Sequence, residues 1–128
     1  METIHQSVLD SLPRKRALPL LSILAALLVG DGYVAGCGYR GGLVKFDRDG
    51  KAESVWFVPE RDGCASFFCA QTHEMPDGHV YMAHWTGHGA DDSKMGWQVV
   101  EFDREGNAVW HLHDPARFGS IAGIDVLP

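Results

Sequence analysis

The stretch Val99-Val100-Glu101-Phe102-Asp103-Arg104-Glu105-Gly106-Asn107-Ala108-Val109-Trp110 decides the fold, because residues 43–56 carry the same pattern. In both copies an apolar run ends in Phe-Asp-Arg, an acidic residue and a glycine, and a second apolar run with a tryptophan follows. An Asp-Gly pair precedes each copy, so that one unit occupies residues 31–59 and the other residues 77–115. Repeats about 50 residues apart indicate stacked units that bury a core only against one another.

Each unit is predicted to form four short antiparallel strands. In the second copy these are residues 68–75, 79–85, 97–102 and 107–112, which are rich in aromatic and β-branched residues and bounded by turn signals. The glycine of each Asp-Arg-acid-Gly turn supplies the positive φ that a tight hairpin needs. A four-stranded meander that recurs along a chain is typical of a β-propeller blade.

The predicted fold class is all-β, a partial β-propeller with two four-stranded antiparallel blades and the first strand of a third. The blades span about residues 22–59 and 67–115, and residues 120–128 align with residues 68–76 as the extra strand. Residues 1–16 are expected to be a leader or tail, and residues 17–128 the partial propeller. Because a closed propeller has about 4–8 blades, the chain is expected to be a fragment of a longer protein.

The run from Ala17 to Val29 allows two predictions. It follows the basic cluster Arg14-Lys15-Arg16, as in a secretory signal, and Cys37 would then be the acylated residue of a lipoprotein. Alternatively the run holds the first strand of the first repeat, because residues 22–30 align with residues 68–76. We favour the strand. The run is shorter than the ~20 residues of a membrane-spanning helix.

The composition limits the classes of partner that we expect this chain to bind. The 128 residues suffice for one small domain, and 45% hydrophobic with 22% charged residues indicates a folded chain. A net charge of −6 and a single short basic cluster argue against nucleic acid and favour a small molecule or a protein. Among the three cysteines, Cys64 and Cys69 are the pair expected if a disulfide forms, and Cys37 then has no partner. The alternative, which we favour, is that Cys64 and Cys69 are buried free thiols.

The meander predicts that three loops share one end of the molecule, namely residues 61–66, 84–96 and 114–120. We call this the loop end. The loop at 84–96 is about ten residues longer than its counterpart in the first unit, and binding residues often lie in such insertions. The candidate ligand-binding residues are His84, Trp85, His88, His73 and Arg117. Arg117 either clamps an anion or pairs with Asp114, and we favour the pair.

Metal binding is a weaker hypothesis. His84, His88 and Asp91, with Asp92 beside it, offer nitrogen and oxygen ligands, but no helix fixes the spacing of the two histidines. His111 and His113 alternate onto one strand face, and we expect both to be solvated. Two tryptophans that end the repeated pattern, Trp56 and Trp110, are expected to pack between blades.

Residues 99–110 and 43–56, with His84-Trp85-Thr86-Gly87-His88-Gly89, resemble the bacterial PQQ-binding-like β-propeller repeat proteins of the quinoprotein alcohol dehydrogenase-like superfamily. Arylsulfotransferase-like propellers are similar. The resemblance implies a secreted or periplasmic propeller, in some members with PQQ near the axis. This chain is too short to enclose an axial cofactor and lacks the vicinal Cys-Cys pair of the dehydrogenases, so that no cofactor is assigned.

The function expected is therefore that of a repeat module, not catalytic on its own, that binds a ligand or partner through the loop end. The alternative is a piece of a quinone-dependent oxidoreductase-like or arylsulfotransferase-like enzyme. Exposed blade edges also suggest self-association. The chain contains no Gly-x-Ser-x-Gly, Walker-type or His-Glu-x-x-His motif.

Overall fold

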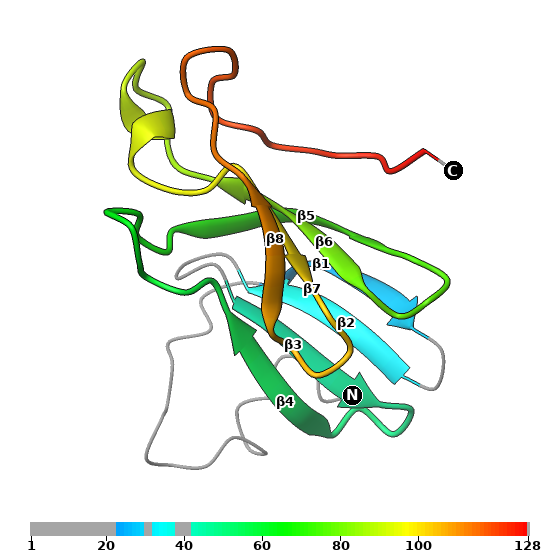
Figure 1. The fold of residues 1–128 in the computed structure, drawn as a ribbon. Coiled ribbons are helices and arrows are strands. Elements are labelled where there is room, and N and C mark those ends of the chain that lie inside the picture. The colour runs from blue at the N-terminus through cyan, green and yellow to red at the C-terminus, as the bar shows by residue number, and fades with distance from the viewer. Residues whose placement is uncertain (1–22, 30–31, 38–41, 128) are drawn as a thin grey trace, which may run out of the picture.

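Two four-stranded antiparallel sheets make up the fold (Figure 1). The computed structural model describes residues 23–29, 32–37 and 42–127. The first sheet contains β1 (Ile23–Val29), β2 (Gly32–Cys37), β3 (Gly42–Asp47) and β4 (Ala52–Phe57). The second contains β5 (Phe68–Glu74), β6 (Val80–Trp85), β7 (Val99–Phe102) and β8 (Ala108–Leu112). The short 3₁₀ helix η2 (Asp92–Lys94) lies between β6 and β7.

Strand order follows the chain in both sheets, as a meander requires. The all-β class and the two blades are therefore confirmed. Within the apolar run of residues 17–29, the part from Ile23 onward is strand β1, in agreement with the favoured alternative. The leader or tail at residues 1–16, and residues 17–22, lie outside the described residues.

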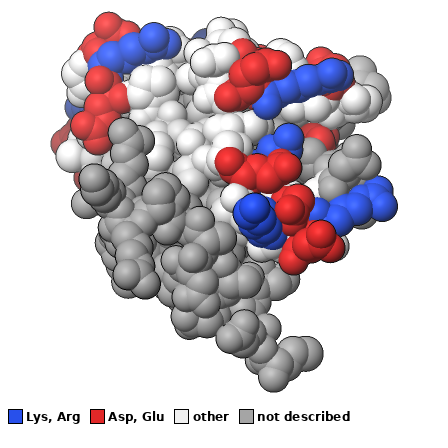
Figure 2. Space-filling model, turned by 90° about the horizontal axis from the view of Figure 1, so that it is seen from below, with Lys and Arg blue, Asp and Glu red and all other residues white. Residues whose placement is uncertain are grey.

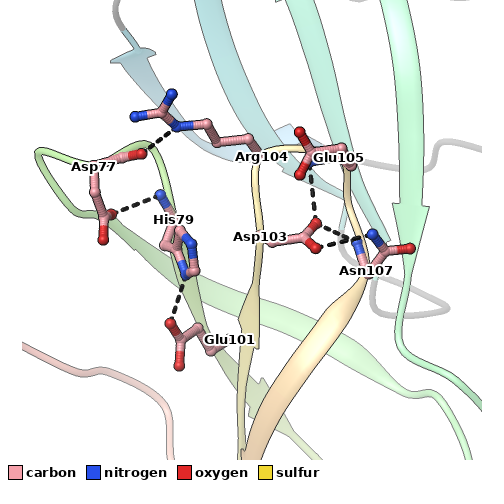
Figure 3. A network of polar contacts seen from close by, with 7 residues as sticks. All are labelled: Asp77, His79, Glu101, Asp103, Arg104, Glu105 and Asn107. Atoms are coloured by element: carbon pink, nitrogen blue, oxygen red, sulfur yellow. Dashed lines mark hydrogen bonds and ion pairs between the residues drawn. The ribbon is translucent and has the colours of Figure 1, made fainter.

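The repeated turn motif has the same geometry in both sheets because its aspartate organises the backbone. Oδ1 of Asp47 accepts hydrogen bonds from the N–H groups of Asp49 and Lys51, at 3.0 and 2.8 Å. Oδ1 of Asp103 accepts from Glu105 and Asn107 at the same two distances (Figure 3). Gly50 and Gly106 then take φ values of 80° and 88°, which strongly favour glycine.

A β-bulge follows each of these turns at the same place. The register shifts by one residue between Lys45 and Phe46 in the first sheet and between Glu101 and Phe102 in the second. The extra residue is Glu53 on β4 and Val109 on β8, both on the strand at the sheet's edge. A bulge of this kind bends the strand and increases its local twist.

The main core lies between the two sheets. Apolar side chains of the first sheet (Val34, Leu43 and Trp56) meet those of the second (Val80, Met82, Val100 and Phe102) in one buried cluster. Trp56 is 7% exposed, and its ring centroid lies 6.1 Å from that of Phe102. The opposite face of the first sheet has its own buried cluster of Ala35, Val44 and Phe46.

Trp56 packs between the sheets as expected, but the same expectation for Trp110 is wrong. Trp110 is 48% exposed, and its nearest ring is that of Tyr81, at 6.2 Å. The two tryptophans lie on corresponding faces of their sheets but at different register positions, since Trp56 pairs with Leu43 whereas Trp110 pairs with Glu101, the counterpart of Lys45. Trp110 lies on the face of the second sheet that turns away from the first, and no described sheet covers that face.

The expected strand at residues 120–128 is not present, since residues 120–127 form no strand. They run as an extended segment past β5 (Figure 1): the N–H of Ile124 donates to Oε1 of Gln71 at 3.1 Å, and Asp125 pairs with His73. The segment lacks the ladder partners that would make it a strand, because the described chain holds no third sheet.

Cys64 and Cys69 are buried thiols that form no disulfide with each other, as favoured from the sequence. The side chain of Cys37 lies outside the description. No helix in the described ranges is both long and apolar enough to cross a membrane.

Replacing each of the two turn glycines by alanine distinguishes the cost of a positive φ from the cost of a steric clash. A Cβ at Gly106 would lie 2.1 Å from Cδ1 of Trp56, whereas one at Gly50 meets nothing within 4 Å. We expect Gly50→Ala to cost about 1 kcal/mol through its positive φ, and Gly106→Ala to cost about 1–3 kcal/mol more. Urea unfolding measures both, and equal losses would contradict the packing of Trp56 on this turn.

The two tryptophans provide a second test. Trp56→Ala removes a buried ring and should lower the free energy of unfolding by about 3–5 kcal/mol. Trp110→Ala, in dilute protein, should cost about 1 kcal/mol or less, because the ring is half exposed and has one aromatic neighbour on the sheet. Thermal or chemical denaturation checks the order, and a larger loss for Trp110→Ala would refute the assignment of faces.

Candidate functional site

The loops that join β4 to β5, β6 to β7, and the end of β8 to the C-terminal segment gather at one end of the molecule, opposite the hairpin turns (Figure 1). This is the arrangement that the meander predicted for the loop end. The candidate residues expected there nevertheless take up different roles, and they do not form one site.

His84 is a structural residue. It is fully buried; Nδ1 lies 2.6 Å from the carbonyl oxygen of Trp97, and Nε2 lies 2.7 Å from the backbone nitrogen of Phe67. The neutral ring fits both contacts when Nδ1–H donates to Trp97 and Nε2 accepts from Phe67. Burial lowers the pKa of His84, although the hydrogen bond to Trp97 opposes the shift. His84 thus joins the long loop to β5 and has no ring nitrogen left for a ligand.

Trp85 and His88 do lie together. Their ring centroids are 4.5 Å apart in an edge-to-face contact, and Phe68 meets the other side of this group at 5.6 Å from Trp85. His88 is exposed and Trp85 is partly buried. The pair therefore presents an aromatic surface beside the loop end.

His73 and Arg117 lie apart from that pair, each with an acidic partner. His73 on β5 places Nδ1 at 3.3 Å from Asp125. Arg117 pairs with Asp114 at 2.6 Å, as favoured from the sequence, and this contact lowers the pKa of Asp114. Gln98 holds the same loop by donating to the carbonyl oxygens of Phe118 and Gly119.

The metal hypothesis gains no support from the arrangement. Both nitrogens of His84 are engaged, and Asp91 pairs with Lys94 at 2.5 Å, which lowers the pKa of Asp91. Asp92 accepts a hydrogen bond from the N–H of Gly89. In the described part of the chain, no group of three His, Cys, Asp or Glu side chains is arranged to hold a metal ion.

A different cluster occupies the loop end, centred on the buried indole of Trp97. The ring of His111 stacks on it, with centroids 3.9 Å apart and planes 10° from parallel. The guanidinium carbon of Arg61 lies 5.0 Å from the same indole centroid, a cation–π contact. We call Arg61, Trp97, His111 and His113 the Trp97 cluster.

His113 connects this cluster to Cys64. Nδ1 of His113 lies 3.0 Å from the carbonyl oxygen of Gly96, so that it carries the proton, and Nε2 faces Sγ of Cys64 at 4.0 Å. The pKa of Cys64 is raised, first by burial and then by the nearby carboxylate of Asp62. The thiol thus stays protonated at neutral pH.

Arg61 brings a positive charge to the exposed side of the cluster. Burial lowers the pKa of His111, and the charges of Arg61 and His113 add to this, while Asp62 acts in the opposite direction. Arg61 is about half exposed, and its described ion pair, with Asp62, is long at 3.9 Å. Of this cluster, only the His-x-His pair at the end of β8 could be recognised in the sequence. No sequence pattern indicates that Arg61 approaches it from another loop.

Elsewhere the charges are mixed. Figure 2, which shows the molecule from below, has Lys and Arg beside Asp and Glu among the residues drawn in colour.

The buried neutral His84 should make stability depend on pH. Its folded pKa lies below 6.5, so the unfolded chain binds the proton more readily and stability falls as pH drops below that value. We expect a decline of up to about 1.4 kcal/mol per pH unit in unfolding free energy from this residue.

His84→Gln should remove this part of the pH dependence, and His88→Gln, an exposed histidine of the same loop, should leave it in place. Denaturant unfolding between about pH 5 and pH 8, the range in which histidines titrate, gives the unfolding free energy of each variant at each pH. Parallel curves for the parent and His84→Gln would show that His84 is not a buried neutral bridge.

No family model and no curated protein matches the chain. Among solved structures, it is similar to the crystal structure at 1.35 Å of a protein of unknown function from Bacteroides caccae. The two are 27% identical, with a TM-score of 0.60 over 76% of this chain and 36% of that chain. This chain therefore matches little more than a third of that protein's length, and the likeness concerns the fold.

Proposed function

We propose that this chain is a propeller-type repeat module that binds a small anionic ligand at the loop end, on the Trp97 cluster. The observation that carries the proposal is the position of Arg61 and His111, which both lie against one buried indole. Two groups that can carry positive charge thus contact the same indole, in a chain with a net charge of −6.

The cluster is held in place before any ligand arrives. Trp97 is 1% exposed, and its carbonyl oxygen accepts the hydrogen bond from His84. His111 extends from β8, where it pairs with Val100. Because the indole and the strand hold these side chains in place, binding an anion would cost little free energy for ordering them.

The chemistry of the cluster selects a carboxylate, phosphate or sulfate group. The guanidinium of Arg61 offers N–H donors to such a group, and a protonated His111 adds another. Burial lowers the pKa of His111 most, and the charge of Arg61 adds to the shift; a bound negative charge would oppose the effect of Arg61. Anion binding should therefore raise the pKa of His111.

We propose ligand binding rather than covalent catalysis at the Trp97 cluster. Cys64 and His113 are the nearest approach to a nucleophile and its base, but the thiol is protonated and its contact with the ring is long. The oxidoreductase-like and arylsulfotransferase-like alternatives, which the sequence left open, have no described residue that favours them.

A protein partner at the same end is the second candidate. Met95 and Phe118 are large apolar side chains of two loops there, and both are exposed. Such side chains anchor protein interfaces when they cluster. A partner of this kind would depend on Met95 and Phe118, and a small anion would not.

Titration with inorganic phosphate and with sulfate, followed by NMR chemical shifts, tests the proposal. We expect saturable shifts around Trp97, and a loss of affinity of about tenfold or more in the double variant Arg61→Gln/His111→Gln. Affinity should increase as pH falls below about 6.5, because the protonated imidazole is then available.

Arg117→Gln is the matched control, because Arg117 is an exposed loop arginine that already has Asp114 as its partner. It should leave anion binding unchanged. Absence of saturable binding, or equal losses in the control and the double variant, would overturn the proposal.

A further inference from the structure

The turn at residues 61–64, between β4 and β5, contains a strained aspartate. Asp62 has a φ of 57° and is the one described residue other than glycine with a positive value. Gly63 follows at 75°, and the N–H of Cys64 donates to the carbonyl oxygen of Arg61 at 2.9 Å. Two successive positive φ values are typical of a type I′ turn. Because an L-residue is strained in this region, Asp62 leaves its native conformation more easily than a glycine would.

An aspartate that precedes a glycine can isomerise without an enzyme. The glycine nitrogen attacks Cγ of the protonated carboxyl group, the N–H proton and the carboxyl hydroxyl leave as water, and a succinimide ring forms. Water then opens the ring at either carbonyl. Opening at the side-chain carbonyl restores aspartate, whereas opening at the backbone carbonyl leaves isoaspartate, in which the main chain runs through the side-chain carbons. The attack requires that the peptide group between the two residues can rotate toward the carboxyl group.

Hydrogen bonds oppose this rotation at two Asp-Gly pairs of the chain. The N–H of Gly50 donates to the carbonyl oxygen of Asp47 at 3.1 Å, and that of Gly78 donates to Met75 at 2.9 Å. In the described chain, the N–H of Gly63 has no such acceptor. The sequence holds four Asp-Gly pairs, at residues 31–32, 49–50, 62–63 and 77–78, and the last three lie wholly within the described residues.

The Asp62-Gly63 pair is also open to water. The side chain of Asp62 is 76% exposed, and its ion pair with Arg61 is long, at 3.9 Å. A Cβ placed on Gly63 would meet no atom within 4 Å. The surroundings therefore leave room for the ring to close.

The Asp77-Gly78 pair is the opposite case, because neighbouring groups hold and cover it (Figure 3). Oδ1 of Asp77 accepts a hydrogen bond from the N–H of His79 at 3.0 Å. Arg104 donates to the carbonyl oxygen of Asp77, and its side chain would lie 3.0 Å from a Cβ on Gly78. Both the carboxyl group and the peptide group are thus engaged.

We propose that Asp62-Gly63 is a modification site, where the folded chain forms succinimide and accumulates isoaspartate, while the turns at residues 49–50 and 77–78 protect their own pairs. Isoaspartate lengthens the main chain by one methylene carbon inside the turn. The hydrogen bond from Cys64 to Arg61 would then be lost, and with it the position of Arg61 beside Trp97. The effect on anion binding rests on the proposed function, whereas the modification itself does not.

Asparagine at two of these positions tests the proposal, because Asn-Gly forms the same ring with loss of ammonia, and the hydrolysed product differs in mass. Asp62→Asn is compared with its matched control Asp77→Asn, each as the full folded chain at neutral pH. Asparagine tolerates a positive φ, so that the turn at residues 61–64 should still form. We expect Asp62→Asn to deamidate about tenfold faster, because the control must first break the hydrogen bond of Gly78.

In concentrated urea the two variants should deamidate at similar rates, which assigns the difference to the fold. In the aged parent, peptide mapping with fragmentation that distinguishes the isomers should find isoaspartate at residue 62 before residues 49 and 77. Equal rates for the two folded variants would overturn the proposal, as would isoaspartate that appears first at residue 49 or 77. No anion enters this test, so that its failure and the failure of the proposed function can be told apart.

Discussion

The rest of the structure depends on the contact between the two sheets at Trp56. A single four-stranded sheet of short strands cannot bury both of its faces, and the pair gains a core only where the first sheet meets the second. The indole of Trp56 fills the space beside Phe102 and over Gly106. In the Trp97 cluster, Arg61 lies on the loop after β4, the strand of Trp56, and Trp97 precedes β7, the strand of Phe102. The geometry of the candidate site therefore depends on how the two sheets pack.

The aspartate of the repeated turn sets the position of the sheets' outer strands. Because Asp47 and Asp103 bind the backbone of their own turns in the same way, β4 and β8 leave their hairpins with the same geometry. The network around Asp103 also reaches the neighbouring turn, where Arg104 donates to the carbonyl oxygen of Asp77 (Figure 3). Local hydrogen bonds thus define the end of the molecule opposite to the loop end.

The strands, their order and the turns could be predicted from the sequence, because alternation and turn residues act over a few neighbouring positions. The exposure of Trp110 could not, because it depends on whether another sheet covers β8. The same limit applies to His84, whose partners Phe67 and Trp97 come from separate loops. Arg61 and His111 are about 50 residues apart in the chain, and only tertiary packing brings them to one indole.

The bulges at Glu53 and Val109 have a consequence for how the protein behaves at high concentration. Edge strands with regular, unpaired backbone groups are templates for amyloid-like growth, and proteins commonly interrupt them. Here the interruption lies in one edge strand of each sheet, β4 and β8, close to the hairpin. An incoming strand would find the spacing of donors and acceptors broken after the first residues. The chain therefore carries in its backbone a barrier against fibril formation that does not depend on its net charge.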